Sequence, residues 1–215
     1  MKYLTDINLL DPEKHYTYAD YLLWRFKERV ELIRGKIFRM TPAPSTSHQN
    51  IVTVLVSSIH QFLKNKICKV FPAPFDVRLP EYPGEQDQDM ETIVQPDITV
   101  ICDPDKIDEK GCKGAPDLIV EVLSPNSVSK DLHEKYEVYE KAGVREYWVV
   151  HPAEKTITAF ILKNGKYETF KPLTRGDQIS SVVLPGFTIS LEEIFQDTFR
   201  EPEPDYVTKT RRLDP

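Results

Sequence analysis

Two short apolar segments of this chain each carry one carboxylate, and this pairing constrains the fold more than any other feature. Asp97 lies in the segment 93–102, directly after Gln95 and Pro96, and Glu121 lies in the segment 118–123. Both segments are rich in isoleucine and valine, which indicates two neighbouring buried strands. Because a carboxylate is costly to bury without a cation or hydrogen-bond donors, two such acids favour a shared divalent metal site.

Strand alternation sets which faces the two acids occupy. It places Asp97 on one face of its strand with Gln95, and Glu121 on one face of the next with Leu123. If the two faces coincide, both carboxylates reach one ion, and their oxygen ligands suit Mg²⁺ or Mn²⁺. The alternative is that both acids lie at strand ends, where backbone amides or salt bridges stabilise them without a metal.

Lys135 interrupts the apolar stripe of a helix expected from about 129 to 142, with Gly143 as its C-terminal cap. At about 100° per residue, Lys135 lies within the stripe formed with Tyr136 and Tyr139. A lysine in such a stripe most often lays its stem along the apolar surface and keeps its ammonium in solvent. Since this stripe is expected to face the sheet that carries Glu121, its ammonium could instead orient an attacking water and balance charge on a phosphate.

Two further residues are candidates for the same site. His48 occupies the first turn of a helix in line with Ile51, so it faces inward at the helix end. A lone inward histidine is more often structural than functional. Glu31 begins a strand and is either a third acidic metal ligand or a surface charge. The sequence leaves both questions open.

The remaining elements predict an α/β fold with a mixed central sheet flanked by helices, an N-terminal helix-hairpin and a C-terminal β-hairpin. One domain is expected over residues 1–200, followed by a disordered tail over 201–215 that is rich in proline and charge. In chain order, the additional predicted elements are a helix over 17–27, a hairpin turning at Arg34-Gly35, a helix from 45–47 to about Lys64, a strand over 146–150, a hairpin turning at Asn164-Gly165, and a short helix capped by Ser190.

Composition excludes several classes of protein. The net charge of −6 argues against coating nucleic acid by electrostatics alone, but not against a nuclease with a local basic surface. With neither a membrane-length apolar run nor a signal-peptide pattern, we expect a soluble, cytoplasmic chain without membrane contact. The three cysteines form no Cys-x-x-Cys pair, so reduced thiols are expected. No phosphate-binding glycine loop or serine-hydrolase motif occurs.

Taken together, the motifs resemble those of the Uma-two (Uma2) restriction-endonuclease family. The likeness covers residues 17 to about 195 and is carried by Gln95-Pro96-Asp97, the runs 116–125 and 143–150, Lys135 with Tyr139, and the runs 31–37 and 47–49. The resemblance implies a PD-(D/E)XK nuclease core, magnesium-dependent cleavage of phosphodiester bonds, and homodimers. It matches Asp97 and Glu121 to the metal ligands. The usual lysine of that pattern falls at Leu123, and Lys135 is its matching position in the following helix.

We therefore predict a metal-dependent endonuclease acting on nucleic acid, with DNA favoured as substrate. Asp97 and Glu121 are predicted to hold Mg²⁺ or Mn²⁺, with Glu31 as a further ligand, while Lys135 positions the attacking water and His48 assists. The first alternative is a nuclease-like fold that only binds a partner, which Leu123 and the net acidity favour. A second alternative is hydrolysis of a small phosphate ester at the same metal.

Overall fold

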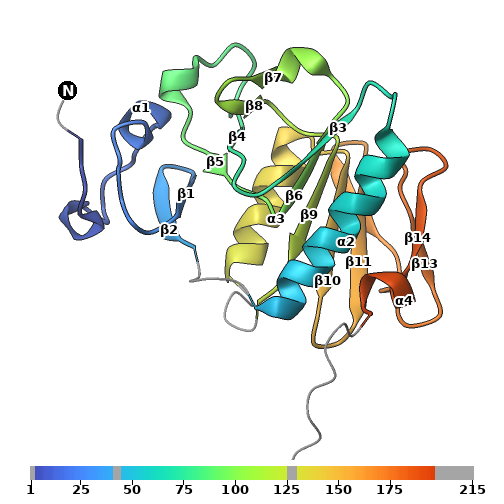
Figure 1. Cartoon of the computed structure of the whole chain (residues 1–215). Coiled ribbons are helices and arrows are strands. Elements are labelled where there is room, and N and C mark those ends of the chain that lie inside the picture. Colours follow the sequence, from blue (N-terminus) through green and yellow to red (C-terminus); the bar gives the residue numbers. More distant parts are fainter. Residues whose placement is uncertain (1–2, 41–44, 125–129, 197–215) are drawn as a thin grey trace, which may run out of the picture.

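The computed structural model describes residues 3–40, 45–124 and 130–196, without the side chains of 130–132 (Figure 1). The predicted tail over 201–215 lies outside the described residues. No helix in the described ranges is long and apolar enough to cross a membrane.

A six-stranded sheet forms the centre of the molecule, in the order β12-β11-β10-β9-β6-β3. Strands β9 and β10 run parallel, and the other neighbouring pairs in this sheet run antiparallel. Helices α2 and α3 lie on opposite sides of it (Figure 1), which confirms the predicted α/β fold. The elements are β3 (Lys69–Pro72), β6 (Ile98–Ile101), β9 (Leu118–Val122), β10 (Glu146–His151), β11 (Thr156–Lys163), β12 (Lys166–Thr169), α2 (Thr46–Leu63) and α3 (Lys130–Ala142).

Alternation along β9 explains why both faces of the sheet are covered. Val120 packs in the same core as Leu55 of α2, whereas Ile119 packs with Val138 of α3. Glu121 follows Ile119 by two residues and therefore shares its face, toward α3. The β9–α3 side of the sheet is thus where the candidate site forms.

A second six-stranded sheet, in the order β2-β1-β5-β4-β8-β7, is formed by strands that lie within residues 30–113. The hairpin of β1 and β2 turns at Arg34 and Gly35, whose φ angles of 50° and 75° suit a tight turn, as predicted. The elements of this sheet are β1 (Val30–Ile33), β2 (Lys36–Arg39), β4 (Val77–Arg78), β5 (Ile93–Val94), β7 (Ile107–Asp108) and β8 (Gly111–Lys113).

The smaller elements complete the fold. A C-terminal hairpin and α4 pack against the α2 side of the central sheet, and Ser190 caps α4 as predicted. The β11–β12 hairpin turns at Asn164-Gly165, also as predicted. The remaining elements are α1 (Tyr18–Tyr21), α4 (Leu191–Ile194), β13 (Gln178–Ser180), β14 (Thr188–Ser190) and the 3₁₀ turns Ile7–Leu9, Asp87–Asp89 and Pro104–Lys106.

The helix predicted over 17–27 is shorter than expected, since α1 ends at Tyr21. The following backbone pairs with the N-terminal segment instead. Leu4 N–H donates to Leu23 O (3.0 Å), and Arg25 N–H donates to Leu4 O (2.8 Å). The backbone of Leu23 and Arg25 thus bonds to Leu4, which is distant in sequence, instead of to residues one helical turn away. Local periodicity cannot predict such a tertiary contact.

The prediction of one strand over 93–102 is also wrong. Residues 93–94 form β5 of the second sheet, whereas residues 98–101 form β6 of the central sheet. The chain crosses between the sheets at Gln95, Pro96 and Asp97. Proline lacks the N–H that a ladder needs, which favours a break at this point. Asp97 therefore lies at the junction of the two sheets rather than within a strand.

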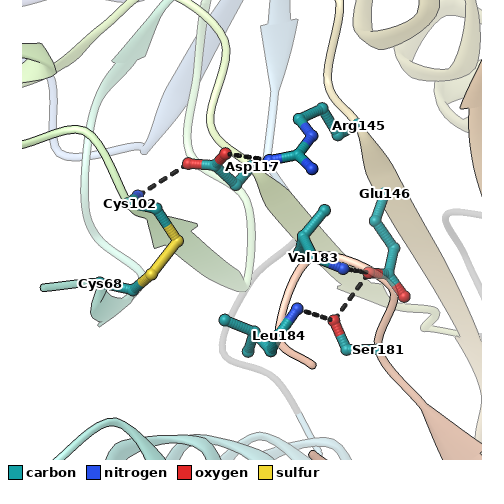
Figure 2. Close-up of a disulfide and its surroundings, with 8 residues drawn as sticks. All are labelled: Cys68, Cys102, Asp117, Arg145, Glu146, Ser181, Val183 and Leu184. Carbon is teal, nitrogen blue, oxygen red and sulfur yellow. Dashed lines mark hydrogen bonds and ion pairs between the residues drawn. A yellow bond between two sulfur atoms is a disulfide. The ribbon is translucent and has the colours of Figure 1, made fainter. Parts of the chain in front are cut away.

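A disulfide joins Cys68 to Cys102, contrary to the expectation of reduced thiols (Figure 2). It extends the antiparallel pairing of β3 with β6, in which Lys69 lies opposite Ile101. Beside it, Cys102 N–H donates to Asp117 Oδ2 (2.7 Å). The disulfide closes β6 at the end opposite Asp97. Cys112 is free and buried.

Candidate active site

Lys135 of α3 links acids from both sheets. Its Nζ lies 3.0 Å from Glu121 Oε1 on β9 and 2.9 Å from Glu31 Oε1 on β1. The three residues are only 8%, 8% and 5% exposed, in that order. The stripe of α3 therefore faces the sheet as the sequence predicts, and this lysine does not extend to solvent.

Asp97 is held against the end of β9. Its Oδ2 accepts a hydrogen bond from Val122 N–H (2.8 Å) and lies 3.2 Å from His48 Nε2. Because Val122 follows Glu121, this bond sets Asp97 beside the second acid of the pair.

His48 is placed by the start of α2, where its N–H donates to the N-cap oxygen of Ser45 (3.2 Å). This confirms the inward orientation that the helical spacing predicts. The ring is buried, and among the described residues its Nδ1 has no hydrogen-bond partner.

The charges in this cluster shift one another. Burial raises the pKa of Glu121 most strongly, the Lys135 ammonium opposes that rise, and the charges of Asp97 and Glu31 add to it, giving a pKa of about 7. Burial lowers the pKa of Lys135, but Glu121 and Glu31 together raise it above its usual range. The lysine is therefore an ammonium at neutral pH, while Glu121 titrates near neutrality.

His48 responds to the same field. Burial lowers the pKa of its imidazole, but the hydrogen bond with Asp97 and the charges of Asp97 and Glu121 outweigh this effect, so the pKa is raised overall. A histidine in this setting readily carries a proton next to the two acids.

Tyr139 is a site residue to which the spacing argument assigns no role. It lies one turn after Lys135 on α3, and its hydroxyl donates to the same Glu121 Oε1 (2.8 Å). The i, i+4 spacing with Lys135 in the stripe was the signal that could have identified it.

Gln95 is a second contact that strand alternation did not reveal. Its backbone N–H donates to Glu31 Oε1 (2.7 Å), and its side-chain amide donates to Asp76 Oδ1 (2.7 Å). Glu31 is thus held by Lys135 and Gln95 together. Leu123, at the usual lysine position, packs partly buried in the apolar cluster that includes Val138 of α3.

The donor chemistry of the cluster suits a divalent cation at two of its acids. No three His, Cys, Asp or Glu side chains within the described residues form a group that could hold a metal ion. Asp97 and Glu121 nevertheless each keep a carboxylate oxygen, Oδ1 and Oε2, that accepts no hydrogen bond from the described residues. Their mutual repulsion contributes to the raised pKa of Glu121, and a cation at these hard oxygen atoms would relieve it.

The chain is similar to known proteins in sequence and in fold. The family profile of Uma2, described as "putative restriction endonuclease", matches residues 18–192. The chain belongs to the Uma2 family. This confirms the resemblance drawn from Gln95-Pro96-Asp97 and the neighbouring motifs.

A solved structure has a similar fold. The crystal structure of a "putative nuclease belonging to DUF820" from Anabaena variabilis superposes with a TM-score of 0.65 at 22% sequence identity, covering 83% of this chain and 97% of that chain. No curated protein matches. The Uma2 chain thus has a restriction-endonuclease-like fold, and its family is described as one of "putative restriction endonuclease" proteins, a class that generally uses divalent metals.

Proposed function

We propose that this Uma2 protein is a metal-dependent endonuclease that hydrolyses phosphodiester bonds of DNA. The observation that carries the proposal is the position of Lys135, whose ammonium lies 3.0 Å from Glu121 although Leu123 occupies the usual lysine position. An acid pair with a lysine beside it is thereby present in a nuclease fold. A buried lysine in an apolar stripe would otherwise be an unfavourable choice.

Asp97 and Glu121 are the residues that would hold Mg²⁺ or Mn²⁺. A metal held by these residues would supply Lewis-acid chemistry, activating a water and offsetting negative charge on the scissile phosphate. Lys135 supplies a fixed positive charge that can orient the attacking water, and Tyr139 and Glu31 hold the lysine–glutamate pair in place. His48 fixes Asp97 and can donate a proton near it.

The finer features of this proposal come from the family. DNA as substrate and homodimer formation are expected from the resemblance. The structure leaves β12 at one edge of the central sheet, which is a strand edge that a second copy could cover. Light scattering of the purified protein checks the dimer.

The decisive experiment is cleavage of supercoiled plasmid with Mg²⁺ or Mn²⁺. Asp97→Ala, Glu121→Gln and Lys135→Ala are each expected to abolish metal-dependent nicking. The matched control is Glu146→Gln, which alters another buried glutamate and should still cut. Glu146 accepts hydrogen bonds from Trp148 and Ser181 (2.7 Å each), away from the cluster.

The outcomes separate the competing functions. Undiminished cutting by Glu121→Gln would remove Glu121 from the mechanism. Absence of metal-dependent cutting in the wild type, together with metal-independent binding of a partner, would favour the binding-module alternative. Hydrolysis of a small phosphate ester at a rate matching that of long DNA would favour the third.

A further inference from the structure

Arg29 is an exposed arginine fixed beside the acid cluster. It precedes Glu31 by two residues in the same extended segment, so both side chains lie on one face. The pairing of β1 with β2 extends to this position, since Met40 N–H donates to Arg29 O (3.0 Å). The backbone of Arg29 is therefore fixed by the hairpin, close to the site residue Glu31.

A single amide orients the guanidinium. Arg29 Nη2 and Nε donate to Gln95 Oε1 at 2.7 and 3.2 Å. The other end of that amide donates to Asp76 Oδ1, which also accepts from Tyr21 OH (3.2 Å). The amide is thus held with its oxygen toward Arg29. Because Gln95 N–H also binds Glu31, one residue links the arginine to the acid cluster.

Within the described residues, no ion pair neutralises the guanidinium of Arg29, although its charge reaches Asp76 beyond the amide and opposes the rise in the pKa of that partly buried carboxyl. The hydrogen-bond partner of Arg29 is a neutral amide. By contrast, Arg34 and Arg145 each face a carboxylate, Glu137 at 2.8 Å and Asp117 at 3.2 Å. Two of the five guanidinium N–H donors of Arg29 are used by Gln95, which leaves three for a ligand.

We infer that Arg29 binds a backbone phosphate of the nucleic acid, next to the one that is cleaved. This inference rests on the proposed nuclease function and assigns it a substrate contact. An oriented guanidinium with free donors matches phosphate geometry. A chain with a net charge of −6 also needs local positive charge to bind nucleic acid, and an arginine that forms no ion pair in the described ranges supplies it beside the acid cluster.

The test compares two arginines of one hairpin. Binding of a fluorescent DNA duplex is measured by anisotropy at several salt concentrations, with Ca²⁺ in place of Mg²⁺ to suppress cutting. Arg29→Gln is expected to weaken binding on the order of tenfold and to lower the slope of log K against log salt by about 0.9.

Arg39→Gln is the matched control. Arg39 is also exposed and also bound by a neutral amide, Asn8 Oδ1 at 3.0 Å, but it lies opposite Val30 and so on the other face of the hairpin. This variant is expected to bind DNA like the wild type. Arg29→Lys, which keeps the charge, should recover most of the salt slope, a result that a purely structural role of Arg29 would not produce.

The outcomes distinguish this inference from the proposed function. Metal-dependent cutting by the wild type combined with an unchanged affinity and salt slope in Arg29→Gln overturns the inference alone. Equal losses in Arg29→Gln and Arg39→Gln overturn it as well, because the effect would then be general charge. A wild type that neither binds nor cuts DNA overturns both.

Discussion

Replacing Lys135 by methionine removes one buried charge while keeping most of the apolar stem. In the native protein the ammonium lies 3.0 Å from Glu121 and 2.9 Å from Glu31. The variant leaves two buried carboxyl groups without their cation. Removing one partner of a buried ion pair typically costs about 3–5 kcal/mol, so we expect a loss of that size in the unfolding free energy at pH 8.

The loss should depend on pH in a direction that the structure fixes. Burial raises the pKa of Glu121 to about 7 from 4.5, so the folded state binds more protons than the unfolded state between these values. Stability from this group is therefore fully present below pH 4.5 and falls as pH rises toward 7, by about 3 kcal/mol. Without the ammonium the pKa of Glu121 rises further, so the decline continues above pH 7. The destabilisation by Lys135→Met is expected to be smaller at pH 5.5 than at pH 8.

Urea unfolding in EDTA, followed by tryptophan fluorescence at both pH values, measures this difference. Lys166→Met is the control. Lys166, on β12, pairs with Glu140 of α3 (2.7 Å), the helix that carries Lys135, but Lys166 is exposed, so its loss should leave stability essentially unchanged. Equal effects of the two variants, or a loss for Lys135→Met that is the same at both pH values, would refute the buried-pair reasoning.

The remaining predictions concern the metal and the disulfide. Mn²⁺ affinity measured by calorimetry should rise between pH 6 and 8, since Glu121 must lose its proton to bind; a flat profile would exclude it as a ligand. Tyr139→Phe removes a donor to the charged form of Glu121, so it should move the midpoint of that profile to higher pH and cost about 1 kcal/mol of stability; an unmoved midpoint would contradict this role. Cys68→Ser should lower the unfolding free energy by about 4 kcal/mol in non-reducing buffer, because the disulfide with Cys102 spans 34 residues; identical wild-type stability with and without reductant would count against that bond.

Local signals predicted most elements of the fold. Helix ends depend on interactions within a few residues, which is why two of them were predictable: Ser45 caps α2, and Gly143, with φ of 90°, ends α3. The turns at Arg34-Gly35 and Asn164-Gly165 are equally local. Helical periodicity placed Lys135 in the stripe that faces the sheet, but it left open whether the ammonium stays inside or reaches solvent.

What the sequence did not predict depends on which segments meet across the fold. The pairing of β3 with β6 brings Cys68 to Cys102, and the sequence spacing of the three cysteines gives no information about that strand register. The contact of Gln95 with Glu31 likewise requires β5 to pair beside β1. The break at Pro96 was visible in the sequence, but the apolar residues on both sides of it favoured one strand.

That break accounts for the composition of the candidate site. Glu121 belongs to the central sheet, Glu31 belongs to the second sheet, and Asp97 lies where the chain crosses between them. A lysine at position 123, directly after β9, would extend from the central sheet itself. A lysine on α3 instead reaches both sheets at once, as the two distances from Lys135 Nζ show. Moving the lysine to the helix therefore joins the acid of the second sheet to the site, and a variant at Glu31 should disturb Lys135 and Glu121 together.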